Sequence, residues 1–163
     1  MVALRSGYIF VLAVLFVGCA TTPDGLAPIR NSEPSPDLTP REVVQIQLRA
    51  FGNNNAEDEG IEIGFRFASP GNRRRTGPLP RFTAMLKGPA YGVMLEHDRA
   101  EYAAVVVREE QAVQRVRLIR GDTVAVYDFY LRRQNETDCQ GCRMTEAVYL
   151  SGAGTIREGQ QTL

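Results

Sequence analysis

Two cysteines lie three positions apart, Cys139 and Cys142 in the sequence CQGC. A CxxC pair can bind a metal, exchange disulfides or form a structural disulfide. A metal site needs further soft ligands, and His97 is the only histidine of the chain. A thioredoxin-type redox cysteine begins a helix after a strand, whereas this pair lies in a polar turn before a β-like segment. We therefore predict a disulfide that pins a turn, or two thiols that stay reduced, and no metal site.

Acid–base catalysis needs a titratable pair within one cavity, and the candidates here are His97 and Asp128. Asp128 lies between Tyr127 and Phe129, so in a strand its carboxylate points away from the face that carries both rings. A lone histidine is more often a hydrogen-bonded structural residue. The sequence contains no glycine-rich phosphate loop or nucleophile elbow. We expect a non-catalytic protein without a cofactor; the alternative is an enzyme that uses His97 as acid or base.

The third cysteine, Cys19, follows an apolar run over residues 8–17. Arg5, this run and a small-residue exit are typical of a secretory signal, and the run is shorter than the ~20 residues of a membrane span. The sequence LFVGC at residues 15–19 resembles the bacterial lipobox, in which a small residue precedes a cysteine that is acylated before cleavage. The usual leucine three residues before the cysteine is replaced by Phe16. The resemblance implies lipid attachment at Cys19.

The alternative is a secreted protein cleaved near Gly18 or Ala20. In Gram-negative lipoproteins an aspartate after the cysteine favours the inner membrane, so Ala20 implies outer-membrane sorting with the domain in the periplasm. The chain has 19 Lys and Arg against 19 Asp and Glu, and such a balance does not suggest a nucleic-acid partner. The expected partner is the membrane, through the lipid anchor.

Composition divides the chain into four parts. Residues 1–18 form the predicted signal peptide, and residues 19–38 form the acylated cysteine with a proline-rich tether. At about 3.1 Å per residue, this tether would hold the domain several tens of ångströms from the bilayer. Residues 39–150 form one domain, and residues 151–163 form a flexible polar tail.

The domain begins with helical signals and continues with strand signals. Thr39, Pro40 and Glu42 form a capping box with proline at the first helical position, which predicts a helix to residue 51. Residues 61–68 are ambiguous, because their apolar residues fit both the alternation of a strand and one face of a helix. Periodicity alone favours the strand. Further helices are expected after Pro78 and near residues 91–95.

Strand patterns occupy residues 100–108, 111–119, 122–133 and 142–150, separated by turn residues. Helices followed by an antiparallel meander predict an α+β fold, with the helices packed on one face of a curved sheet.

Residues 65–97 carry a distinctive run: Phe67, the segment Ala68-Ser69-Pro70 with Asn72, Thr76-Gly77-Pro78, Arg81-Phe82, Tyr91 and Leu95. This run resembles the domain-of-unknown-function family DUF4864, and the similarity extends over about residues 40–148. The resemblance favours a helix over residues 61–68. It also implies a fold similar to the nuclear-transport-factor-two-like cone, in which a curved sheet and helices surround an apolar pocket.

We therefore expect an envelope lipoprotein whose domain binds a small apolar ligand in the cone or a partner protein on the open sheet face. The pocket candidates are Phe65, Phe82, Met85, Tyr91, Met94 and His97, although such apolar side chains also build ordinary cores.

The segment ASPGNRRRTGP, residues 68–78, is predicted to be a structural loop. Gly71 and Asn72 suit a turn, and Thr76 or Gly77 would cap the helix that follows Pro78. Its three arginines, residues 73–75, would be solvated, the alternative being that they meet lipid phosphates.

Overall fold

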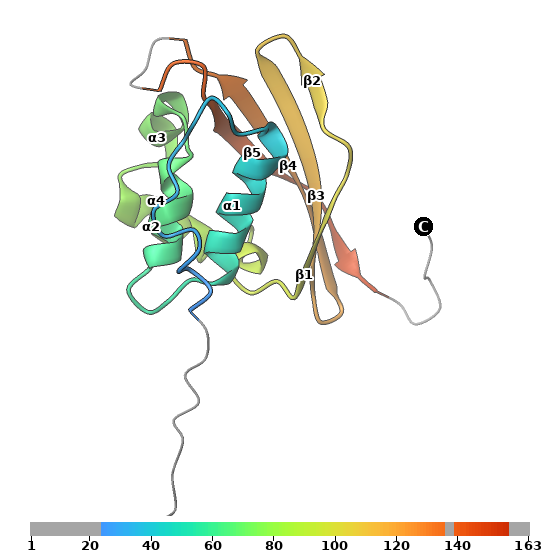
Figure 1. The fold of residues 1–163 in the computed structure, drawn as a ribbon. Helices are drawn as coiled ribbons and strands as arrows, with labels where there is room; N and C mark the ends of the chain where they lie inside the picture. Colours follow the sequence, from blue (N-terminus) through green and yellow to red (C-terminus); the bar gives the residue numbers. More distant parts are fainter. Residues whose placement is uncertain (1–23, 136–138, 157–163) are drawn as a thin grey trace, which may run out of the picture.

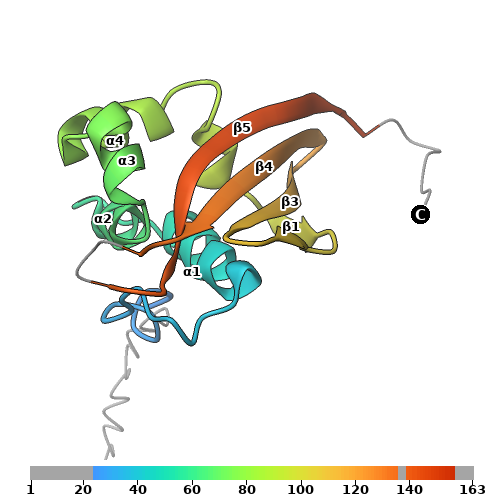
Figure 2. The ribbon, with the colours of Figure 1, turned by 90° about the horizontal axis from the view of Figure 1, so that it is seen from above.

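The fold places a layer of helices against one face of an antiparallel sheet, as Figures 1 and 2 show. A computed structural model describes residues 24–135 and 139–156. The helical elements are α1 (Pro40–Gly52), α2 (Glu59–Arg66), α3 (Pro70–Thr76), α4 (Leu79–Leu86) and the short 3-10 helix η1 (Gly92–Met94). The strands are β1 (Arg99–Tyr102), β2 (Val106–Arg108), β3 (Gln111–Arg120), β4 (Thr123–Arg133) and β5 (Arg143–Thr155). The predicted α+β class is confirmed.

Helix α1 begins where its capping box predicts. The Glu42 backbone N–H donates to the Thr39 hydroxyl, and the Thr39 N–H donates to the Glu42 carboxylate at 2.8 Å. The helix buries Val44 and Leu48 against the sheet and ends at Gly52, after Phe51.

The segment that alternation assigned to a strand is helix α2. Ile61 and Ile63 are both fully buried although they lie on different sides of the helix. Ile61 belongs to the main core, whereas Ile63 packs in a second cluster with Leu26, Ile29 and Ala50. Because α2 is covered on two sides, its apolar residues recur every second position and imitate a strand.

The predicted loop over residues 68–78 is wrong, because it contains helix α3. The Ser69 hydroxyl accepts from the Asn72 N–H at 3.0 Å and so caps this helix, with Pro70 in its first turn. The expected cap of α4 is also absent: the Thr76 hydroxyl donates back to the Asn72 carbonyl at 3.0 Å, and α4 has no side-chain cap.

The sheet follows the order β1-β3-β4-β5, and β2 pairs with the N-terminal part of β3, residues 111–113. All these pairs are antiparallel. The first predicted strand is divided into β1 and β2, and Gln114 Nε2 donates to the Ala103 carbonyl between them at 2.8 Å. The inner face of β4 carries Ala125, Tyr127, Phe129 and Leu131, all buried. Asp128 faces the other way, as predicted, and pairs with Arg115.

Both ends of the described domain extend further than composition predicted. The expected tether is wrong from residue 24 onward, because Leu26 and Ile29 are only 1% and 6% exposed. Burial of these two apolar side chains packs the proline-rich segment against the domain. The expected tail begins too early, since β5 continues to Thr155 alongside β4. The signal peptide and Cys19 lie outside the described residues.

Among residues 24–135 and 139–156, none of the helices has the length and hydrophobicity needed to cross a bilayer.

Candidate functional site

A cavity of about 210 Å³ lies where the helices meet β5. Its walls come from α1, α3, α4, η1 and residues 145–149 of β5. A larger hollow of about 630 Å³ lies at the β2–β3 turn, but charged side chains such as Arg108, Glu110 and Arg132 line it. Ligand sites are usually concave and mostly apolar with a few placed polar groups, so the cavity against β5 is the better candidate.

One side of the cavity is apolar and belongs to the main core. Phe82 and Leu86 reach it from α4, Met94 from η1 and Phe129 from the inner face of β4. Phe51, in the last turn of α1, also lines the cavity, and its ring centroid lies 6.4 Å from that of Phe82. These rings and aliphatic groups would contact an apolar ligand by dispersion and exclusion of water.

Another part of the lining is polar, and its side chains are buried. The Thr145 hydroxyl donates to Gln47 Oε1 at 2.7 Å, and Gln47 Nε2 donates to the Gly64 carbonyl at 3.0 Å. Asn72 Nδ2 donates to the Thr145 carbonyl, also at 3.0 Å. Three distant segments thus supply one hydrogen-bonded wall, as buried polar groups require.

A short parallel bridge fixes this wall. The Ser69 N–H donates to the Thr145 carbonyl and the Thr145 N–H donates to the Phe67 carbonyl, each at 2.9 Å. The bridge joins Ala68 to Thr145 and thereby sets the start of α3 against β5. The motif Ala-Ser-Pro-x-Asn therefore positions the polar wall of the cavity.

The mouth carries opposite charges on Arg75 of α3 and Glu146 of β5. Arg75 Nη2 donates to the Glu146 backbone carbonyl at 2.5 Å and lies 3.5 Å from the Glu146 carboxylate. The Tyr91 hydroxyl donates to the Val148 carbonyl at 3.1 Å and ties the segment before η1 to β5. Exposed charges beside a largely apolar interior favour a ligand with one polar end.

Four of the six predicted pocket residues line the cavity: Phe82, Met85, Tyr91 and Met94. Phe65 does not, because its ring packs on Phe82 with a centroid distance of 4.8 Å and lies under the Arg73 guanidinium. His97 is also outside the lining. Its Nδ1 lies 2.9 Å from the Met94 carbonyl, and its ring lies against Gly52.

Sequence reasoning missed the polar wall and the charged mouth. Gln47 carried a signal, since a glutamine on the apolar side of α1 must find a buried partner. Thr145, Glu146 and Arg75 carried none, because their proximity depends on pairing between segments far apart in the chain.

Two buried side chains of β4 have shifted pKa values. Burial, with a smaller contribution from Tyr91, raises the pKa of Tyr127 to about 12, and its hydroxyl donates to the Ala90 carbonyl at 2.8 Å. The hydrogen-bonded guanidinium of Arg115 lowers the pKa of Asp128, and that pair lies on the outer face of the sheet. Neither residue is among those that line the cavity.

A disulfide joins Cys139 to Cys142. It closes a turn in which Gly141 has a φ of 84°, a left-handed conformation suited to glycine. The Gln134 N–H donates to the Cys142 carbonyl at 2.8 Å, so the turn leads directly into β5. Within the part of the chain that the structure describes, no group of three His, Cys, Asp or Glu could hold a metal ion.

Comparison with known proteins gives one match. The model of DUF4864, described as a domain of unknown function, matches residues 35–149. No curated protein and no solved structure matches the chain.

Proposed function

We infer that this chain, which belongs to the DUF4864 family of domains of unknown function, is a cell-envelope protein that binds a small, largely apolar ligand. In this proposal Cys19 is acylated and anchors the protein, most simply in the outer membrane, with the domain in the periplasm. The order of helices and strands supports a cone of the nuclear-transport-factor-two-like kind around the cavity.

The cavity against β5 carries the ligand proposal. Its volume of about 210 Å³ is below the roughly 300–1,000 Å³ typical of sites for drug-sized molecules, so the ligand would be small. An alkyl chain or single ring would contact Phe82, Met94 and Phe129. An amide has two N–H donors, and Asn72 uses one toward Thr145, so the other would serve a polar end of the ligand.

A cavity-filling variant tests this proposal. Met85→Trp would place an indole in the cavity from α4, whereas Val107→Trp adds the same ring on exposed β2. Each protein is titrated with the single-ring probe fluorobenzene, observed by ¹⁹F NMR, and with short alcohols as competitors. We expect Met85→Trp to abolish alcohol competition and Val107→Trp to retain it. Equal competition in both variants would exclude the cavity as the site.

A second occupant is favoured by one observation on the outer face of the sheet. Tyr130 and Tyr149 are 41% and 60% exposed, and their rings meet edge to face at 5.5 Å. Exposed aromatic pairs are typical of protein interfaces. An envelope protein that docks on this face would be displaced by Tyr130→Glu, while probe binding in the cavity would be unchanged, because Tyr130 is not among the lining residues.

The alternative of a cone-fold isomerase or cyclase would place an acid or base inside the cavity. His97, the residue assigned to that role, is not among the lining residues, and no observation on the described residues favours the enzyme. We therefore retain the binding proposal.

The anchor is tested separately. Cys19→Ser should prevent labelling with a palmitate analogue and leave the protein out of the detergent phase. Unchanged detergent partitioning of Cys19→Ser would refute acylation and leave the cavity proposal standing.

A further inference from the structure

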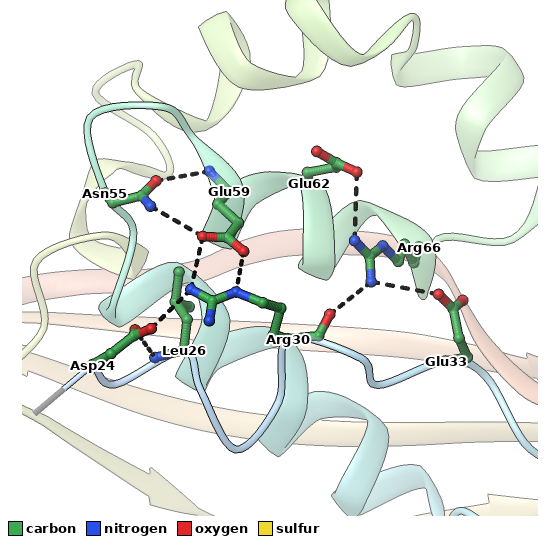
Figure 3. A network of polar contacts seen from close by, with 8 residues as sticks. All are labelled: Asp24, Leu26, Arg30, Glu33, Asn55, Glu59, Glu62 and Arg66. Carbon is green, nitrogen blue, oxygen red and sulfur yellow. Dashed lines mark hydrogen bonds and ion pairs between the residues drawn. The ribbon is translucent and has the colours of Figure 1, made fainter.

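Residues 24–33 are fastened to α2 by a network of polar contacts, drawn in Figure 3. Arg30 Nε donates to Glu59 Oε1 at 2.5 Å, and its Nη2 donates to Asp24 Oδ2 at 2.8 Å. Asn55 Nδ2 donates to the Glu59 carboxylate at 3.1 Å. The Arg30 carbonyl in turn accepts from Arg66 Nη1 at 2.9 Å. The segment is therefore held to α2 by both its side chains and its backbone.

Apolar contacts seat the same segment. Leu26 and Ile29 are buried with Ala50 and Ile63, so their apolar surface is removed from water. Gly25 lies so close to Asn53 that a Cβ on it would stand 1.8 Å from Oδ1. The chain thus becomes part of the folded domain within its first described residues, 24 to 26.

Covalent geometry then limits the distance to the proposed anchor. Four residues, 20–23, separate Cys19 from Asp24, and a fully extended chain spans at most ~3.6 Å per residue, or about 18 Å in all. A compact domain of about 130 residues has a radius of gyration near 14 Å, hence a width of roughly 35 Å. Because this linker is shorter than the width of the domain, it restricts how the domain can rotate relative to the membrane.

We propose that the domain lies directly on the membrane surface, with residues 24–30 and the α1–α2 loop, residues 53–58, facing the phospholipid headgroups. This inference rests on the lipid anchor of the proposed function. The facing end carries a small negative charge: residues 24–30 and 53–58 contain Asp24, Glu57 and Asp58 against Arg30, a net charge of −2, although Arg30 pairs with Asp24 and Asp58 pairs with Lys87 at 2.7 Å. The short linker rather than charge attraction sets the orientation, and salt, which screens the repulsion between these carboxylates and anionic headgroups, does not abolish it.

Fluorescence energy transfer on vesicles tests the orientation. Because Cys139 and Cys142 form a disulfide and Cys19 carries lipid, a dye can be placed on one introduced cysteine. Ala56→Cys lies in the α1–α2 loop and Gln111→Cys at the β2–β3 turn, and both positions are exposed. In Figure 1, β2 lies near the top of the domain, whereas the blue start of the coloured chain lies near the bottom. The acylated full chain is inserted into phosphatidylethanolamine–phosphatidylglycerol vesicles that contain a headgroup-labelled acceptor.

We expect higher transfer from Ala56→Cys than from Gln111→Cys, at low and at high salt. Roughly fifteen Gly and Ser residues inserted after Pro23 add about 22 Å of flexible reach and should reduce this difference without changing the contacts between residues 24–33 and α2. Equal transfer from both positions in the acylated chain of natural length would overturn the orientation alone. Mass spectrometry that finds no acyl group on Cys19 would overturn both the anchor and the orientation.

Discussion

The hydroxyl of Ser69 closes the first turn of α3 and is completely buried. Loss of an N-cap side chain costs about 0.5–2 kcal/mol, so Ser69→Ala should lower the free energy of unfolding by about 1 kcal/mol in urea titrations. Arg74→Ala, an exposed change in the same helix, is the matched control and should be nearly neutral. Full stability of Ser69→Ala would mean that α3 does not need this cap.

Asp128 provides a prediction about pH. The hydrogen-bonded Arg115 lowers its pKa in the folded state, so the pair stabilises the protein above the unfolded pKa of about 3.9. This contribution is lost as the pH falls through the lower folded pKa. Asp128→Asn should therefore reduce stability at pH 6, by about 1 kcal/mol or less because Arg115 is half exposed.

The comparison is made by urea unfolding at pH 6 and pH 3. Wild type and Asp128→Asn should differ less at the lower pH. Arg115→Gln should behave like Asp128→Asn. A difference that grows as the pH falls would contradict the assigned direction of the pKa.

At the scale of elements, local signals predicted α1 and the strands. The capping box at Thr39 and the alternation along β4 each depend on neighbouring residues only. Helix α2 was not predicted by periodicity, because its second covered side is supplied by Leu26 and Ile29. Helix α3 was not predicted although Ser69 and Pro70 form the same local start signal as Thr39 and Pro40, because its seven residues carry no apolar stripe and include Gly71 and Asn72, which favour a turn.

The candidate site shows the same division. The apolar residues Phe82, Met85 and Met94 were predicted from resemblance and composition, whereas the hydrogen bond between Thr145 and Gln47 joins residues 98 positions apart. No local pattern reports such a pair. Phe65 and His97 lie close in sequence to lining residues, but they point to other neighbours.

The N-terminal segment supplies a test at this scale. If residues 24–33 were a tether, truncation of Leu26 would be neutral. Because Leu26 is buried between α1 and α2, Leu26→Ala should lower the free energy of unfolding by about 2–4 kcal/mol. The exposed neighbour Ala27, changed to serine, is the control. Equal stability of both variants in urea would show that the segment is not part of the folded unit.

At the scale of the whole molecule, the helical layer and the sheet enclose the cavity along one seam. Helices α3 and α4 and the segment through η1 meet β5 there, and the bridge at Thr145 and the Tyr91 hydroxyl hold the seam together. Residues 24–33 lie on α2, and none of them is among the residues that line the cavity. The proposed ligand site and the proposed membrane-facing segment can therefore be changed separately by mutation.

Methionine methyl NMR tests the central claim most directly. Met85 and Met94 line the cavity, whereas Met144 is buried on β5 outside its lining, so the protein contains its own control. The domain labelled with ¹³C at the methionine methyls is titrated with 1-hexanol. We predict saturable shifts of the Met85 and Met94 methyl signals and an unchanged Met144 signal. Equal shifts of all three signals, or none at saturating alcohol, would contradict ligand binding in this cavity.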